Sequence, residues 1–214
     1  MKKKKPYESL ALLAAFALWT MALCVLDVRP IGPMGSSVGL ASVNGFVHKL
    51  TGVHMTLYHI TDWAGLVPIF VAMGFGFLGL TQWIKRKRLS RVDHSLLVLG
   101  GFYLTVMVTY GFFETVTVNY RPVLIEGVLE TSYPSSTTLL VLCVMPTAIL
   151  QLRSRIRNAA LRTWLSRTLT AFSALVVVGR LISGVHWFTD IVGSVMLSAG
   201  LLCIYYAAVL WNCR

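Results

Sequence analysis

The stretch Glu130–Leu150, ETSYPSSTTLLVLCVMPTAIL, passes from a hydroxyl-rich segment to an apolar run. Its start suits the beginning of a helix, because Ser132 can cap the first N–H groups and Pro134 fits a first turn. The run of hydroxyl residues at 135–138 is longer than a cap requires. The apolar run that follows is long enough to cross a bilayer. The stretch therefore predicts a membrane helix whose N-terminus is capped, binds a ligand, or does both.

The composition assigns the chain to the integral membrane proteins. Of its 214 residues 56% are hydrophobic and only 13% are charged, which is too few to cover a soluble domain of this length. A net charge of +11 would suggest a nucleic-acid partner in a soluble protein. Here the charge lies beside apolar runs, so we expect no nucleic acid as partner. The cysteines have no metal-ligand spacing and are expected to be packing residues without disulfides: Cys24, Cys143, Cys203 and Cys213.

Six segments are long and apolar enough to span a membrane. The predicted fold is therefore all-α, an integral membrane bundle of six transmembrane helices, with residues 1–214 forming a single domain. The basic N-terminus resembles a signal peptide, but its context favours an uncleaved first helix. The predicted spans are Leu10–Leu26, Leu57–Ile84, Leu96–Val118, Ser136–Leu152, Thr168–Ile182 and Asp190–Trp211.

The basic residues predict the orientation of the bundle. Most of them lie in Lys2–Lys5, in Lys85–Arg91, in Arg153–Arg167 and at Arg214. By the positive-inside rule both termini are then cytoplasmic, and the loops after the first, third and fifth spans are external. In the first external loop, apolar residues recur at helical spacing over 40–50. This pattern indicates a short helix on the outer surface or a connector packed on the bundle.

Three successive segments at the predicted external end carry the unusual polar residues. They are ETVTVNYRP with Arg121, then YPSSTT, then GRLISGVHWFTD with Arg180, His186 and Asp190. His186 and Asp190 share one helical face, so the carboxylate can hold one imidazole nitrogen and leave the other free to attack. The arginines suit phosphate oxygens.

The helix N-terminus around Ser135, Ser136 and Thr137 offers unpaired N–H groups to an anion. Each feature also has a structural interpretation, as a cap, a snorkelling arginine or a packed His–Asp pair. Their convergence favours a phosphate site. His59 and Asp62 could ligate a metal, but no third ligand lies near them in sequence, so we expect no metal site.

These segments resemble the type 2 phosphatidic acid phosphatase superfamily, in its membrane-bound branch. The family's third motif has the spacing Ser-Arg-x5-His-x3-Asp, which Arg180, His186 and Asp190 match, with Gly179 in place of the Ser. The first motif, Lys-x6-Arg-Pro, is matched at Arg121, and the second, Pro-Ser-Gly-His, at Ser135. The resemblance extends over essentially the whole chain.

The resemblance implies a mechanism and also exposes two departures. By resemblance His186 is a nucleophile that forms a phosphohistidine, Asp190 orients it, and the phosphoryl group is bound by the residues Arg121, Arg180, Ser135, Ser136 and Thr137. Glu114 replaces the family's Lys, and Thr137 stands where the family keeps its acidic His. A carboxyl with a raised pKa could protonate the leaving group instead, and the candidates are Glu114, Glu126 and Glu130.

The expected function is a multi-pass cell-membrane phosphatase that needs no cofactor and acts on a lipid phosphate or diphosphate at the extracytoplasmic face. Loss of the acid favours a diphosphate such as polyprenyl diphosphate, because a phosphate leaving group needs less protonation than an alkoxide. The alternatives are an impaired relative that binds a lipid head group or partner protein, and a phosphotransferase using the same site. A transporter is disfavoured, because the polar groups crowd at one face. The sequence does not indicate an oligomeric state.

Overall fold

The computed structural model describes residues 6–211 and is all-helical over that range apart from loops and isolated bridges. Lys2–Lys5, Cys213 and Arg214 lie outside the described residues. The elements are α1 (Pro6–Val25), η1 (Pro33–Gly35), α2 (Ala41–Thr51), α3 (Met55–Ala64), α4 (Leu66–Arg86), η2 (Leu89–Arg91), α5 (His94–Thr115), α6 (Ser136–Arg155), α7 (Ala159–Ile182) and α8 (Phe188–Trp211).

Six helical segments are long and apolar enough to cross a membrane, which confirms the predicted fold class. α1, α5, α6, α7 and α8 each supply one span, and α3 and α4 together supply the second, Met55–Arg86. The α3–α4 junction, Gly65, lies against α6. A Cβ atom at Gly65 would lie 3.1 Å from Thr137 Cγ2, so the small residue allows this junction to approach the start of α6.

α6 and α8 form the centre of the bundle and are the most buried spans. α8 packs along α1 on one side and along α6 on the other, and α6 also contacts α4, α5 and α7. Tyr133, just before α6, ties this centre together. Its ring fills the space beside Gly193 of α8, and its hydroxyl lies 2.7 Å from Thr20 Oγ1 of α1. The loop that leads into α6 is therefore fixed to two helices.

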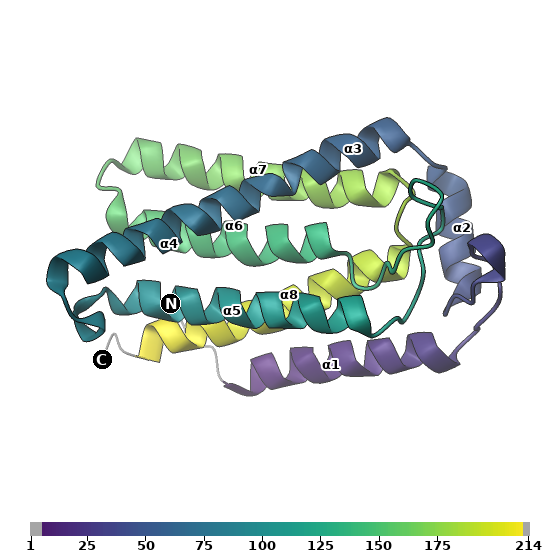
Figure 1. The fold of residues 1–214 in the computed structure, drawn as a ribbon, viewed down its shortest axis with the longest axis horizontal. Coiled ribbons are helices and arrows are strands. Elements are labelled where there is room, and N and C mark those ends of the chain that lie inside the picture. Colours follow the sequence, from purple (N-terminus) through teal and green to yellow (C-terminus); the bar gives the residue numbers. More distant parts are fainter. Residues whose placement is uncertain (1–5, 212–214) are drawn as a thin grey trace.

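The two ends of the bundle carry different connections (Figure 1). At one end lie α2, the long α5–α6 loop, the start of α6 and the α7–α8 turn. At the opposite end lie the α4–α5 and α6–α7 connections and the last turn of α8, and α1 begins on that side of the bundle. The basic loops thus share one end, as the charge pattern requires, while the side of the membrane that each end faces stays a prediction.

The fifth span begins earlier than predicted, at Ala159 instead of Thr168. The basic residues of this region were assigned to a loop, but Arg162 and Arg167 lie on α7. The helix extends because Asn158 caps it, accepting a hydrogen bond from the Leu161 N–H at 3.0 Å. The third span ends at Thr115, slightly before the predicted Val118.

α2 is the helix that the apolar spacing over 40–50 predicted. Its buried Asn44 donates to the Thr189 hydroxyl at 2.9 Å and so attaches α2 to the start of α8. Val43, Phe46 and Leu50 lie on the exposed side of α2. Among the cysteines that the structure describes, Cys143 and Cys203 are buried, Cys24 is exposed, and all three are free thiols.

Candidate active site

His186 lies in the short turn between α7 and α8 and is 3% exposed. Its Nδ1 lies 3.1 Å from the Ser132 carbonyl oxygen, which can only accept, so Nδ1 carries the proton. Nε2 is therefore the unprotonated nitrogen, and it lies 3.4 Å from Nη1 of Arg121. The pKa of His186 lies well below its usual value. Burial is the largest cause, and the nearby guanidinium groups of Arg121 and Arg180 lower the pKa further. The ring is thus neutral near pH 7, and its Nε2 lone pair accepts a hydrogen bond from the Arg121 guanidinium.

Asp190, in the first turn of α8, holds the turn that carries His186. It was expected to accept the imidazole N–H directly, but its Oδ2 lies 3.6 Å from Nδ1, beyond hydrogen-bond length. The carboxylate instead accepts the Trp187 N–H at 2.9 Å, and the Ser132 carbonyl accepts the imidazole Nδ1–H at 3.1 Å. The sequence could not show this, because a backbone carbonyl leaves no residue signature. Asp190 is fully buried, and its carboxyl group lies beside the imidazole ring.

Arg180 is buried on the other side of the site and is held by three groups. Its Nη2 donates to Thr137 Oγ1 at 2.7 Å and pairs with Asp62 Oδ1 at 2.9 Å, and its guanidinium lies 4.9 Å from the centre of the Tyr58 ring. The Thr137 hydroxyl accepts from Arg180, so its observed contact positions a cation. This contact gives Thr137 a part in the site that does not require it to act as an acid.

Arg121 completes the cationic pair. Its Nε forms an ion pair with Glu130 Oε2 at 3.0 Å, and its guanidinium lies 5.8 Å from the Tyr58 ring centre. Tyr58 therefore lies next to both arginines. Tyr58 and Asp62 were not predicted as site residues. The His59–Asp62 spacing was the one available signal, and the structure uses Asp62 to pair with Arg180; no group of three potential metal ligands occurs within residues 6–211.

The α6 N-terminus begins at Ser136, so Ser135 is the cap residue and not Ser132, and Pro134 precedes the first turn. The first intrahelical bond is donated by Leu139 to the Ser135 carbonyl, which leaves the N–H groups of residues 136–138 without a partner in the helix. The buried hydroxyl of Ser135 also has no partner in the described structure. Donors of this kind at a helix N-terminus can bind an anion.

The three candidate acids have different positions. Glu114, on the last turn of α5, lines a small cleft that His186, Arg121 and Ser136 also line, and it accepts from the Thr131 hydroxyl at 3.5 Å. Glu130 is engaged by Arg121. Glu126 lies in an exposed turn away from the cleft lining. Glu114 is therefore the carboxyl that shares a cleft with the imidazole and is not paired with an arginine.

The site as a whole can bind a tetrahedral anion beside a neutral imidazole. Nε2 lies 3.4 Å from the Arg121 guanidinium, and Ser136 at the start of α6 lines the same cleft. Arg180 does not line this cleft, but its buried charge is close enough to lower the pKa of His186. Together with six helices long and apolar enough to span a membrane, this arrangement corresponds to a class of membrane protein with a histidine beside a candidate anion site.

The comparisons agree with this class. Residues 113–214 match the model of the PAP2 superfamily, which confirms the resemblance found in the motifs. The fold is similar to that of a crystal structure described as the first transmembrane PAP2-type phosphatidylglycerolphosphate phosphatase from Bacillus subtilis, with a TM-score of 0.60, 20% sequence identity and 96% coverage of each chain. No curated protein matches the chain. Family and fold together support a phosphatase-type membrane enzyme.

Proposed function

We propose that this single six-helix domain hydrolyses a lipid phosphate or diphosphate at the extracytoplasmic face, through a phosphohistidine on His186. The observation that carries the proposal is the Nε2 atom of His186, which is unprotonated and lies 3.4 Å from the Arg121 guanidinium. A phosphoryl group bound by Arg121 would place phosphorus within reach of this lone pair. The face follows from the positive-inside rule.

The reaction has two steps. Nε2 attacks phosphorus, the bond from phosphorus to the leaving oxygen breaks, and Arg121, Arg180 and the N–H groups at the start of α6 bind the other oxygens. The Nδ1 proton stays in its bond to the Ser132 carbonyl, and buried Asp190 stabilises the positive charge that develops on the ring. Water then attacks the phosphohistidine and releases phosphate. In this mechanism the arginines and the helix terminus supply the positive field.

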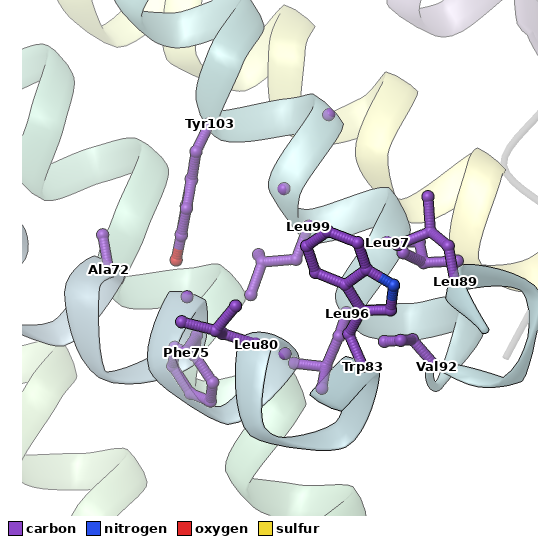
Figure 2. Close-up of a pocket in the computed structure, with 14 residues that line it drawn as sticks. Ala72, Phe75, Leu80, Trp83, Leu89, Val92, Leu96, Leu97, Leu99 and Tyr103 are labelled. Atoms are coloured by element: carbon purple, nitrogen blue, oxygen red, sulfur yellow. The ribbon is translucent and has the colours of Figure 1, made fainter. Parts of the chain in front are cut away.

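The surroundings of the cleft support a lipid substrate. A cavity of about 490 Å³ between α4, α5 and α6 has an apolar lining and shares Tyr110 with the cleft. A second cavity of about 380 Å³ continues along α4 and α5 and shares Ala72 and Tyr103 with the first. Figure 2 shows it, with Tyr103 near one end and Val92 near the other. From Tyr110 to Leu96 the path is about 21 Å long, which suits an apolar chain.

A diphosphate lipid is the proposed substrate class, because Thr137 contacts Arg180 and the family's acidic His is absent. A phosphate leaving group requires less protonation than the alkoxide of a phosphatidate. Purified protein in detergent micelles should release phosphate faster from polyprenyl diphosphate than from phosphatidate, measured at matched subsaturating concentrations. Equal or faster release from phosphatidate would contradict the diphosphate assignment, while no release from either would contradict the phosphatase itself.

Glu114 is proposed as the group that protonates the leaving oxygen. Glu114→Gln keeps the size of the side chain and removes the proton, so release from phosphatidate should fall about 100-fold. Release from polyprenyl diphosphate should fall less than tenfold, since that leaving group departs without an acid. Steady-state kcat on the two substrates measures the difference.

The matched control is Glu126→Gln, which changes an exposed carboxyl outside the cleft lining and should leave both rates unchanged. An equal fall on both substrates for Glu114→Gln would mean that Glu114 acts in substrate binding and not as the acid.

A further inference from the structure

A second polar cavity lies at the opposite end of the bundle from His186. Its volume is about 420 Å³, and it is formed where the end of α6 faces the first turns of α7. The lining consists of three arginines and two hydroxyl residues: Arg153, Arg162, Thr163, Ser166 and Arg167. The length of α6, about 30 Å, separates this cavity from the His186 site.

The arginines of this cavity lack the counter-charges that neighbouring arginines have. Arg86 and Arg155 both pair with Asp93, at 3.1 and 3.6 Å. Within residues 6–211, no carboxylate lies within ion-pair distance of Arg153, Arg162 or Arg167. Three like charges around one cavity repel each other, so an anion bound among them is favoured.

The chemistry of the lining points to phosphate oxygens. Guanidinium groups bind phosphate through paired N–H donors. The hydroxyl hydrogens are already used, since Thr163 donates to the Ala159 carbonyl at 2.9 Å and Ser166 to the Arg162 carbonyl at 2.8 Å. The arginines are therefore the donors available to a ligand.

Apolar side chains beside the cavity indicate where such a phosphate would come from. Leu161 and Trp164, on the same turns of α7, are 46% and 62% exposed. Exposed Trp at the end of a membrane helix is typical of the lipid interface. Basic pockets between membrane helices bind anionic head groups. We propose that this cavity binds the phosphate of an anionic phospholipid in the leaflet opposite the His186 site, as a lipid that does not react.

The test measures the thermal midpoint of the purified full-length protein in neutral detergent, with added short-chain phosphatidylglycerol, phosphatidylcholine or inorganic phosphate. Phosphatidylglycerol should raise the midpoint with a saturable concentration dependence, and phosphatidylcholine should not. In Arg162→Gln/Arg167→Gln the half-saturating concentration should rise at least about tenfold, as expected for losing charge-assisted bonds. The single variant Arg167→Gln, at an exposed position, should raise the half-saturating concentration by less than the double variant does.

The matched control is Arg88→Gln/Arg91→Gln, which removes the same charge from the other connection at this end of the bundle and lies outside the cavity lining. An equal loss in this control would show diffuse attraction to a basic surface and overturn the proposal. If inorganic phosphate raised the midpoint equally and this effect depended on Arg162 and Arg167, the cavity would be a site for a soluble anion and not for a lipid, which would overturn the proposal. The proposal would also be overturned if neither Arg162→Gln/Arg167→Gln nor Arg167→Gln changed the half-saturating concentration of phosphatidylglycerol. Phosphatase activity on micellar substrate is a separate readout and does not decide this proposal.

Discussion

Replacing His186 with Ala should abolish the phosphoenzyme and lower phosphate release by about 10⁴-fold or more. The Nε2 lone pair is the nucleophile in the proposed reaction, and alanine leaves no atom that can form the covalent intermediate. Rapid quench of a single turnover with radiolabelled substrate, under alkaline conditions that preserve phosphohistidine, measures the labelled protein. Wild-type protein should carry label and the variant should carry none.

The matched control for this experiment is His94→Ala. His94 is an exposed histidine at the start of α5, at the opposite end of the bundle, and its replacement should leave labelling unchanged. An unlabelled wild-type protein would favour a binding protein for a lipid head group. Label that passes to an added alcohol or lipid acceptor, with little free phosphate, would favour a phosphotransferase.

Arg180→Lys should lower kcat/KM by about 100- to 1000-fold. Lysine keeps the positive charge, so it can still pair with Asp62 and the buried site remains neutralised. It lacks the planar fork, so it cannot contact Thr137, Tyr58 and a phosphoryl oxygen together. Phosphate release over a range of substrate concentrations, with helicity by circular dichroism as a check of folding, measures the effect.

The comparison for this variant is Arg29→Lys, at the same end of the bundle. Arg29 is an exposed arginine that also pairs with a carboxylate, Asp27 at 2.7 Å, and its replacement should have no effect on turnover. A change of less than tenfold for Arg180→Lys would mean that charge alone is sufficient at this position.

The fold was largely predictable because membrane spans must satisfy their own backbone hydrogen bonds, which ties apolar runs to helices. The start of α7 was not predicted, because arginines in the first turns of a membrane helix resemble a loop until the Asn158 cap is seen. Arg180, His186 and Asp190 were found because they lie in one local segment with regular spacing.

The partners of these residues were not predictable in the same way. Asp62 and Tyr58 lie 118 and 122 positions from Arg180 in sequence, so only the packing of α3 on α7 brings them together. The contact from Ser132 to His186 is made by a carbonyl, which every residue possesses. Local spacing thus identified the candidate site residues, whereas long-range packing determines what holds them.

In the structure each arginine of the site already pairs with a carboxylate of the chain itself, Arg180 with Asp62 and Arg121 with Glu130. An incoming phosphoryl group must compete with these two tethered anions, which lowers its apparent affinity. The two carboxylates have an effective concentration of the order of millimolar or more. They can therefore rebind the arginines and displace inorganic phosphate from the site. In the proposed reaction, these two ion pairs should therefore weaken the retention of phosphate and leave the site free for the next lipid.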